Sequence, residues 1–153
     1  MDMQLPDDFK EFLKLLNDHK VEYLLIGGYA VSYYGYPRAT ADMDVWVRMS
    51  STNAKALVQA LTLFGFAVPN LSEELFLKER NVVRMGIPPL RLEVLLSISA
   101  LEFEDCYSKR LEVDVDGVPV CLIDKADLLI NKKASGRPKD LIDVVELEKL
   151  GHH

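Results

Sequence analysis

The 153-residue sequence has few cysteines and no long apolar run, and each shortage removes a class of protein. Cys106 and Cys121 have neither the number nor the spacing of a metal knuckle or a disulfide framework, so we expect buried thiols without a chemical role. The apolar runs fall far short of the roughly 20 residues that span a bilayer. The amino terminus also lacks a basic-then-apolar targeting pattern. We therefore expect a cytoplasmic protein without a membrane partner.

Positive charge is also scarce, since the formal net charge is -6. Non-specific coating of nucleic acid requires many lysine and arginine contacts to phosphates, so this function is disfavoured, although a local basic patch stays compatible with the charge. With 49% hydrophobic and 27% charged residues, the chain has the composition of one ordinary globular domain. We assign residues 1–150 to that domain and set aside residues 151–153 as a tail of the kind that expression vectors add.

The spacing of apolar residues predicts an α/β chain. An apolar stripe with an acidic first turn indicates a helix over residues 7–19. Ser51, Thr52 and Asn53 are each of a type that can cap a later helix, which Gly65 closes. The remaining expected elements are strands at 22–26, 43–48, 80–87, 90–96, 111–115 and 118–122, a short aromatic helix at 29–34, and helices at 124–133 and 139–150.

Two turns in the second half refine this order. Asp116-Gly117 is a good two-residue hairpin turn between the last two strands. Pro119 then predicts that the last strand lies at a sheet edge, because proline cannot donate to a strand ladder. The expected fold is a mixed central sheet with flanking helices and two C-terminal helices.

Two aspartates one residue apart carry the strongest chemical signal. Side chains alternate along a strand, so Asp42, Asp44 and Trp46 share a face. Their spacing places the two aspartate Cα atoms about 6.6 Å apart, which lets both carboxylates converge on ions between them. Mutual repulsion is costly unless cations neutralise it, and Mg²⁺ prefers carboxylates combined with substrate phosphates. The alternative is the solvated face of an edge strand.

Gly27-Gly28 stands between a predicted strand and a predicted helix, where backbone can approach a phosphate closely. Alone, the pair is more typical of a tight strand-to-helix turn without a ligand. In "GGYAVSYYGYPRATADMDVWV" it is followed, after 13 residues, by Asp, apolar, Asp, apolar. This pattern resembles the nucleotidyltransferase fold of polymerase-beta-like enzymes. It is most similar to small prokaryotic members, including minimal nucleotidyltransferases, AbiEii-type toxins and antibiotic adenylyltransferases.

The resemblance extends over nearly the whole chain and implies further site residues. A third carboxylate is expected on a neighbouring strand, and "LRLEVLLSIS" offers Glu93, where aspartate is the commoner occupant. The alternative for Glu93 is a strand residue paired with Arg91 or Arg84. Through "YPRATADMD" and "NKKASGRPKD" the resemblance implies nucleotide-binding roles for Arg38, Thr40 and Lys132.

Other polar and aromatic residues have competing interpretations. Lys132, Lys133, Arg137 and Lys139 are also compatible with a solvated basic face at a helix end. Asp140 and Asp143 are interpreted as structural residues, with Arg137 as a partner of either. Tyr29, Tyr33, Tyr34 and Tyr36 are typical of core packing more often than of base stacking. Trp46 is expected at the cleft because it shares the aspartate face.

The resemblance implies transfer of a nucleoside monophosphate from a nucleoside triphosphate such as ATP to a hydroxyl acceptor, with release of pyrophosphate. Asp42, Asp44 and Glu93 are expected to hold two Mg²⁺ ions, or Mn²⁺, while Gly27 and Gly28 seat the triphosphate. The acceptor is left open among an antibiotic, a protein and a tRNA, and a toxin would bring an antitoxin partner. The alternatives are a non-catalytic nucleotide-binding or regulatory protein and a structural interaction protein.

Overall fold

The computed structural model describes residues 5–37, 40, 42–65, 70–78, 80, 82–87 and 90–150. The strands are β1 (Tyr23–Ile26), β2 (Asp42–Val47), β3 (Val82–Ile87), β4 (Leu90–Leu95), β5 (Leu111–Val115) and β6 (Val118–Leu122). The helices are α1 (Asp7–Asp18), α2 (Gly27–Tyr33), α3 (Ser51–Phe64), η1 (Glu73–Phe76), α4 (Phe103–Ser108), α5 (Lys125–Ser135) and α6 (Pro138–Leu150).

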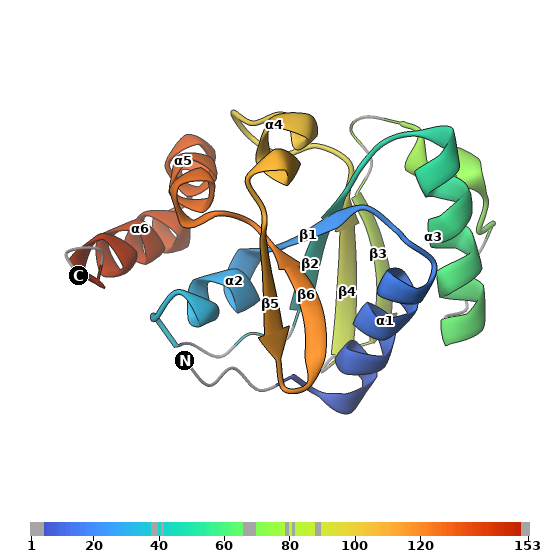
Figure 1. Ribbon diagram of the computed structural model, residues 1–153. Coiled ribbons are helices and arrows are strands. Elements are labelled where there is room, and N and C mark those ends of the chain that lie inside the picture. The colour runs from blue at the N-terminus through green and yellow to red at the C-terminus, as the bar shows by residue number, and fades with distance from the viewer. Residues whose placement is uncertain are drawn as a thin grey trace.

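The strands form one six-stranded sheet in the order β3-β4-β2-β1-β6-β5. The β2/β4 and β1/β6 pairs are parallel, whereas β1/β2, β3/β4 and β5/β6 are antiparallel. Figure 1 shows this sheet with α1 and α3 on one side and the C-terminal helices α5 and α6 on the other. The predicted mixed sheet, its flanking helices and the two C-terminal helices are therefore confirmed.

Helix α1 buries the apolar stripe that its sequence predicts. Phe9, Phe12, Leu13 and Leu16 are all buried, while the acidic first turn faces solvent. Phe12 packs against Phe64 of α3 at a ring-centroid distance of 5.5 Å, so the two helices share one apolar layer. Aromatic and aliphatic burial of this extent is the main force that fixes the helices on the sheet.

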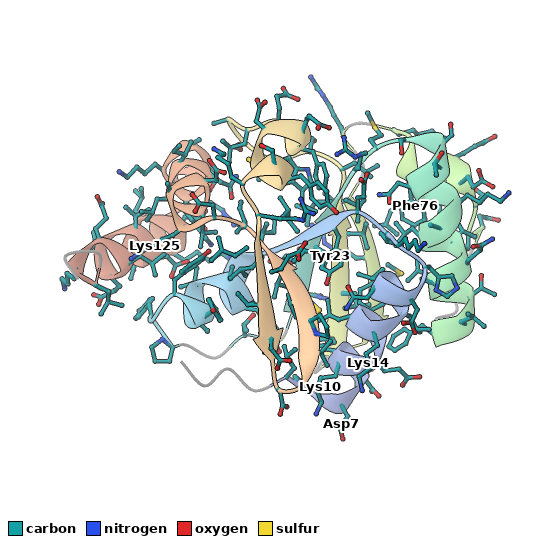
Figure 2. All side chains as sticks on the ribbon, in the orientation of Figure 1. Asp7, Lys10, Lys14, Tyr23, Phe76 and Lys125 are labelled. Atoms are coloured by element: carbon teal, nitrogen blue, oxygen red, sulfur yellow. The ribbon has the colours of Figure 1, made fainter. Side chains whose placement is uncertain are left out.

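The β5–β6 hairpin is joined to α1 and β1 by polar contacts. Its turn has positive φ at Asp116 and Gly117, +53° and +85°, as a two-residue hairpin turn requires. Lys10 of α1 pairs with Asp116 at 3.1 Å, near the hairpin tip in Figure 2. Tyr23, buried beside β6, donates its hydroxyl to Asn17 and accepts from the Cys121 N–H. These contacts set the hairpin on the sheet.

Two local predictions are wrong. Pro119 does not mark an edge, because β6 lies between β1 and β5 and the edge strand is β5. The proline is tolerated since β1 and β6 are in register only at Leu25 and Leu122, beyond Pro119. The cap of α3 is Ser50, whose hydroxyl accepts from the Asn53 N–H at 3.2 Å, and not one of the three residues after it.

Other boundaries differ by small shifts. The third predicted strand begins at Val82 and not at Arg80, and the sequence did not predict η1 or α4. Helix α2 begins at Gly27, so the glycine pair lies in its first turn and not ahead of it. Among the described residues, no helix is long and apolar enough to cross a membrane.

Candidate active site

Strand register brings the predicted carboxylates together. Asp44 lies opposite Ile26 of β1 on one side and opposite Glu93 of β4 on the other. Asp42, two residues before it on β2, is half-buried on the same face. The three carboxylates therefore come from two neighbouring strands, beside the point where β1 runs directly into α2.

The glycine pair is required by close packing on this site. A Cβ on Gly27 would stand 2.1 Å from Asp44 Oδ2 and 3.1 Å from its Cβ, and Gly27 has φ +69°. A Cβ on Gly28 would stand 2.8 Å from Thr40 Oγ1. Residues with a Cβ also disfavour the left-handed region that Gly27 adopts. The absence of side chains at both positions thus lets backbone lie against Asp44 and Thr40.

The carboxyl group of Asp44 lies in a buried and acidic environment. Its Oδ1 is buried and has no hydrogen-bond partner within the described part of the chain. Burial, then the neighbouring Glu93 and Asp42, raise the pKa of Asp44 to about 7, and Lys132 opposes this. A carboxyl group with this pKa has too little compensating positive charge around it, which a bound cation would supply.

Arginines hold the other two carboxylates. Arg91 donates to Asp42 twice, from Nε to Oδ1 at 3.1 Å and from Nη2 to Oδ2 at 2.8 Å. Arg84 of β3 donates from Nε to Glu93 Oε1 at 2.8 Å. Both pairs follow from register, because Arg91 lies opposite Asp42 and Arg84 lies opposite Glu93. The pairing considered for Glu93 is therefore with Arg84 and not with Arg91.

These groups line a polar cavity of about 510 Å³. Its lining combines the three carboxylates with five basic side chains, those of Arg84, Arg91, Lys132, Arg137 and Lys139, together with Gly28 and Thr40. A second cavity of about 280 Å³ adjoins it and shares Asp44, Glu93 and Lys132. The combination suits a ligand that carries both phosphates and cations.

Lys132 lines both cavities and also forms ion pairs with two buried aspartates. Its ammonium lies 3.1 Å from a carboxylate oxygen of Asp140 and 3.1 Å from one of Asp143, and all three residues are buried. Burial opposes ionisation of Asp140, but hydrogen bonds from Arg137, Ser135 and Lys132 outweigh it and hold the pKa of Asp140 below its usual range. The two aspartates thus have the structural contacts expected of them, and Asp140 pairs with Arg137.

The remaining predicted residues have different positions. Thr40 lines the larger cavity and donates its hydroxyl to the Asp42 carbonyl at 3.1 Å. Arg38 lies outside the described residues. Tyr29 is buried against Phe9 at 5.8 Å, which agrees with core packing.

Trp46 is not at the carboxylate cavity. It is only 1% exposed, packs edge-on against Phe103 of α4 at 5.2 Å, and lines a separate cavity of about 280 Å³. The expectation was wrong because α4, which the sequence analysis missed, covers this end of β2. Arg84 and Arg91 were also missed as cavity residues, and their strand register with the carboxylates is the only signal that could have found them.

The donor set suits a hard cation, since all three carboxylates offer oxygen ligands of the kind that Mg²⁺ prefers. Among the residues that the structure describes, no three His, Cys, Asp or Glu side chains are already gathered closely enough to hold a metal ion. Asp42 and Glu93 instead hold arginines. A metal that uses both oxygens of Asp42, or Oε1 of Glu93, therefore has to replace the arginine held there.

Comparison with known families decides the membership of this chain. The profile of the family described as "Nucleotidyltransferase of unknown function (DUF6036)" matches residues 3–151. The chain belongs to this nucleotidyltransferase family. Membership supports nucleotide transfer as its general activity. Among curated proteins, none matches this nucleotidyltransferase significantly.

Solved structures agree on the fold. The lincosamide antibiotic adenylyltransferase LnuA, bound to lincomycin, is similar at a TM-score of 0.63 and 16% identity, covering 95% of this nucleotidyltransferase and 98% of LnuA. The antibiotic-resistance factor ANT(2'')-Ia gives 0.61 and 15%, covering 94% and 80%. A putative nucleotidyltransferase from Thermotoga maritima gives 0.57 and 16%, covering 94% and 88%. At these identities the likeness shows a nucleotidyltransferase fold.

Proposed function

We propose that this protein transfers a nucleoside monophosphate from a nucleoside triphosphate to a hydroxyl group of an acceptor, with release of pyrophosphate and dependence on Mg²⁺. The observation that carries the proposal is the meeting of Asp42, Asp44 and Glu93 beside the Gly27 backbone, in one cavity rich in basic side chains. Three carboxylates in such proximity are costly unless cations offset their charge.

The carboxylates have distinct roles in this proposal. Asp42 and Asp44 would hold both metal ions, and Glu93 would hold one of them or take the proton from the acceptor hydroxyl. Held by these carboxylates, Mg²⁺ would supply positive charge that neutralises the phosphoryl group during transfer. The glutamate side chain is one methylene longer than that of aspartate, so the Glu93 carboxylate can reach a metal ion or the acceptor hydroxyl from β4.

Other residues of the cavity bind the triphosphate. The absent side chains at Gly27 and Gly28 leave space for phosphates to approach the backbone, and Thr40 lines the same space. Lys132 supplies a fixed positive charge, because Asp140 and Asp143 hold its ammonium in place. Arg38 completes the set through the resemblance of the "YPRATADMD" segment. Positioning and charge stabilisation of this kind supply most of the catalysis in phosphoryl transfer.

A small molecule with a hydroxyl group is the acceptor that we favour, with ATP as the donor. The supporting observation is that the similar folds include a lincosamide adenylyltransferase and a structure of ANT(2'')-Ia with adenylyl-2''-tobramycin. An acceptor hydroxyl on a protein or a tRNA, and with it a toxin that has an antitoxin partner, stays a prediction from sequence alone.

The test is pyrophosphate release from each of the four nucleoside triphosphates with Mg²⁺, in the presence of small-molecule or RNA extracts. Asp42→Asn/Asp44→Asn abolishes release, because both metal-binding carboxylates are lost. The matched control is Asp7→Asn/Asp8→Asn, which neutralises an adjacent pair at the exposed start of α1. Release that survives the first double variant, or that stops equally in the second, would contradict the proposal.

A second candidate is a regulatory protein that binds nucleotide without chemistry. The observation in its favour is that Arg91 and Arg84 already neutralise Asp42 and Glu93. It predicts that nucleoside triphosphates raise the melting temperature while no pyrophosphate appears with any acceptor, since a ligand that binds only the folded state must stabilise it. Pyrophosphate release excludes this candidate.

A further inference from the structure

Arg84 and Arg91 hold the same carboxylate oxygens that metal ions need. Arg91 makes a two-pronged contact with Asp42, and Arg84 contacts Glu93 at 2.8 Å. These side chains contact two of the three carboxylates in the larger cavity, and the third, Asp44, has a buried oxygen without a partner among the described residues. A metal that binds Asp42 without phosphate present must displace Arg91 from both carboxylate oxygens, and one that binds Glu93 through Oε1 must displace Arg84.

Both arginines can dissociate from their carboxylate partners at low cost. The Arg84 and Arg91 side chains are 62% and 38% exposed, whereas those of Glu93 and Asp42 are 19% and 28% exposed. Ion pairs with this much solvent access are weak, so exchange of the arginine costs little. The carboxylates are the less exposed partners, on β2 and β4 of the sheet interior, and the arginines carry the longer and more mobile side chains.

The cavity also offers the arginines a second partner. It places Arg84 and Arg91 in one space with Gly28, Thr40 and Lys132, the residues proposed to seat phosphates. A guanidinium matches phosphate oxygens with the same two-pronged geometry that it uses for carboxylates. An arginine released from a carboxylate therefore finds an equivalent partner when a polyphosphate is present, and none when the metal arrives alone.

We propose that Arg84 and Arg91 exchange partners during substrate binding: they hold Glu93 and Asp42 in the free protein and move to phosphate oxygens when divalent cations take these carboxylates. The inference rests on the proposed function for the nature of the ligand. Its consequence is that metal and polyphosphate bind cooperatively. The metal frees the arginines for phosphate, and the polyphosphate draws the arginines away from the carboxylates that the metal needs. By linkage, the polyphosphate raises the affinity for metal by the same factor by which the metal raises the affinity for polyphosphate.

The test measures metal binding directly, without turnover. Free Mn²⁺ is titrated by electron paramagnetic resonance into the wild-type protein, Arg84→Gln and Arg91→Gln, with no phosphate present. Each variant is expected to bind Mn²⁺ about fivefold more tightly, a factor typical of removing one partly exposed ion pair. Arg110→Gln is the matched control, since Arg110 pairs with Glu112 at 3.2 Å outside both cavities and its loss changes the net charge equally.

Inorganic tripolyphosphate is the second probe, and calorimetry at saturating Mg²⁺ measures its affinity. Arg84→Gln and Arg91→Gln are expected to bind tripolyphosphate at least fivefold more weakly than the wild type, because each lacks one guanidinium that would contact a phosphate. Arg91→Lys, which keeps the charge but not the two-pronged contact, should fall between the wild type and Arg91→Gln. A structural role alone would not tighten one ligand while weakening the other.

Wild-type Mn²⁺ affinity in both glutamine variants would overturn the exchange, as would unchanged tripolyphosphate affinity. The control variant must match the wild type in both titrations, since a general charge effect would move it as well. Failure of the proposed function has a different signature. If the opposed shifts occur while no nucleoside triphosphate ever yields pyrophosphate, transfer is refuted and the exchange stands.

Discussion

Gly27→Ala tests whether the glycine at the start of α2 serves the carboxylate site and not the backbone alone. The contacts of the added Cβ with Asp44 include one of 2.1 Å to Oδ2 and one of 3.1 Å to its Cβ. Rotation of the carboxylate relieves the first contact but not the second, so the backbone of α2 or β2 must also shift. The substitution therefore moves the Asp44 carboxylate, whose pKa is raised by burial and by its acidic neighbours.

Gly65→Ala separates this effect from backbone strain. Gly65 ends α3 with φ +86° and has no atom within 4 Å of an added Cβ, whereas Gly27 has φ +69° and the contacts above. Each substitution places alanine in the left-handed region, which costs about 1 kcal/mol. For a domain of this size that cost lowers the melting temperature by about 2–4 °C. Only Gly27→Ala should also lose pyrophosphate release, by about 100-fold, because small displacements at a reacting centre are costly.

The assay compares melting temperature, Mn²⁺ affinity and the rate of pyrophosphate release for the two variants and the wild type. Gly65→Ala is expected to lose stability and to retain Mn²⁺ affinity and rate. Gly27→Ala should lose all three, with a stability loss at least as large. If Gly27→Ala keeps the Mn²⁺ affinity of Gly65→Ala, Asp44 does not depend on this close packing and the reasoning fails.

Three further predictions concern the surrounding structure. Asp140→Asn lowers the free energy of unfolding by about 3 kcal/mol at pH 7, since Lys132 loses one buried partner. The pKa of Asp140 is held low in the folded protein, so the difference between variant and wild type in urea unfolding should be complete above about pH 5 and should shrink below about pH 4. Asn53→Ala lowers the free energy of unfolding by about 2 kcal/mol in the same assay. The buried Asn53 amide accepts a hydrogen bond from the Glu22 N–H and donates to the carbonyls of Glu22 and Arg48. Trp46→Phe leaves tripolyphosphate affinity unchanged in calorimetry, since Trp46 packs on Phe103 and lines a different cavity.

Local patterns predicted the elements well where the signal lies within a few residues. The hairpin strands at 111–115 and 118–122 have the predicted bounds, because Asp116-Gly117 fixes the turn chemically. Helix α1 ends one residue before its prediction, since its apolar stripe and acidic first turn are both local. The edge position predicted from Pro119 was wrong. A proline lacks an N–H donor and is therefore excluded only where both neighbouring strands are fully hydrogen-bonded to it, and β1 and β6 are in register only near Leu122.

The site was predictable in its residue types but not in its contacts. Alternation along β2 predicts that Asp42 and Asp44 share a face, and no other strand is needed for that inference. The positions of Arg84 and Arg91 depend on how β3 and β4 align with β2, which is a long-range register set by the whole sheet. The burial of Lys132 between Asp140 and Asp143 likewise depends on how α5 packs on α6.

The charge balance of the larger cavity explains why an acidic chain of net charge -6 gathers basic side chains there. Five basic side chains line the cavity with three carboxylates, and Arg91 and Arg84 compensate the charges of Asp42 and Glu93. A triphosphate that arrives with divalent cations adds nearly equal charge of both signs, which leaves that balance almost unchanged while the pairs of Arg84 and Arg91 are replaced. A metal or a polyphosphate arriving alone upsets the balance, and the field of the remaining unpaired groups opposes it. The same internal ion pairs therefore favour binding of the two ligands together over binding of either one alone.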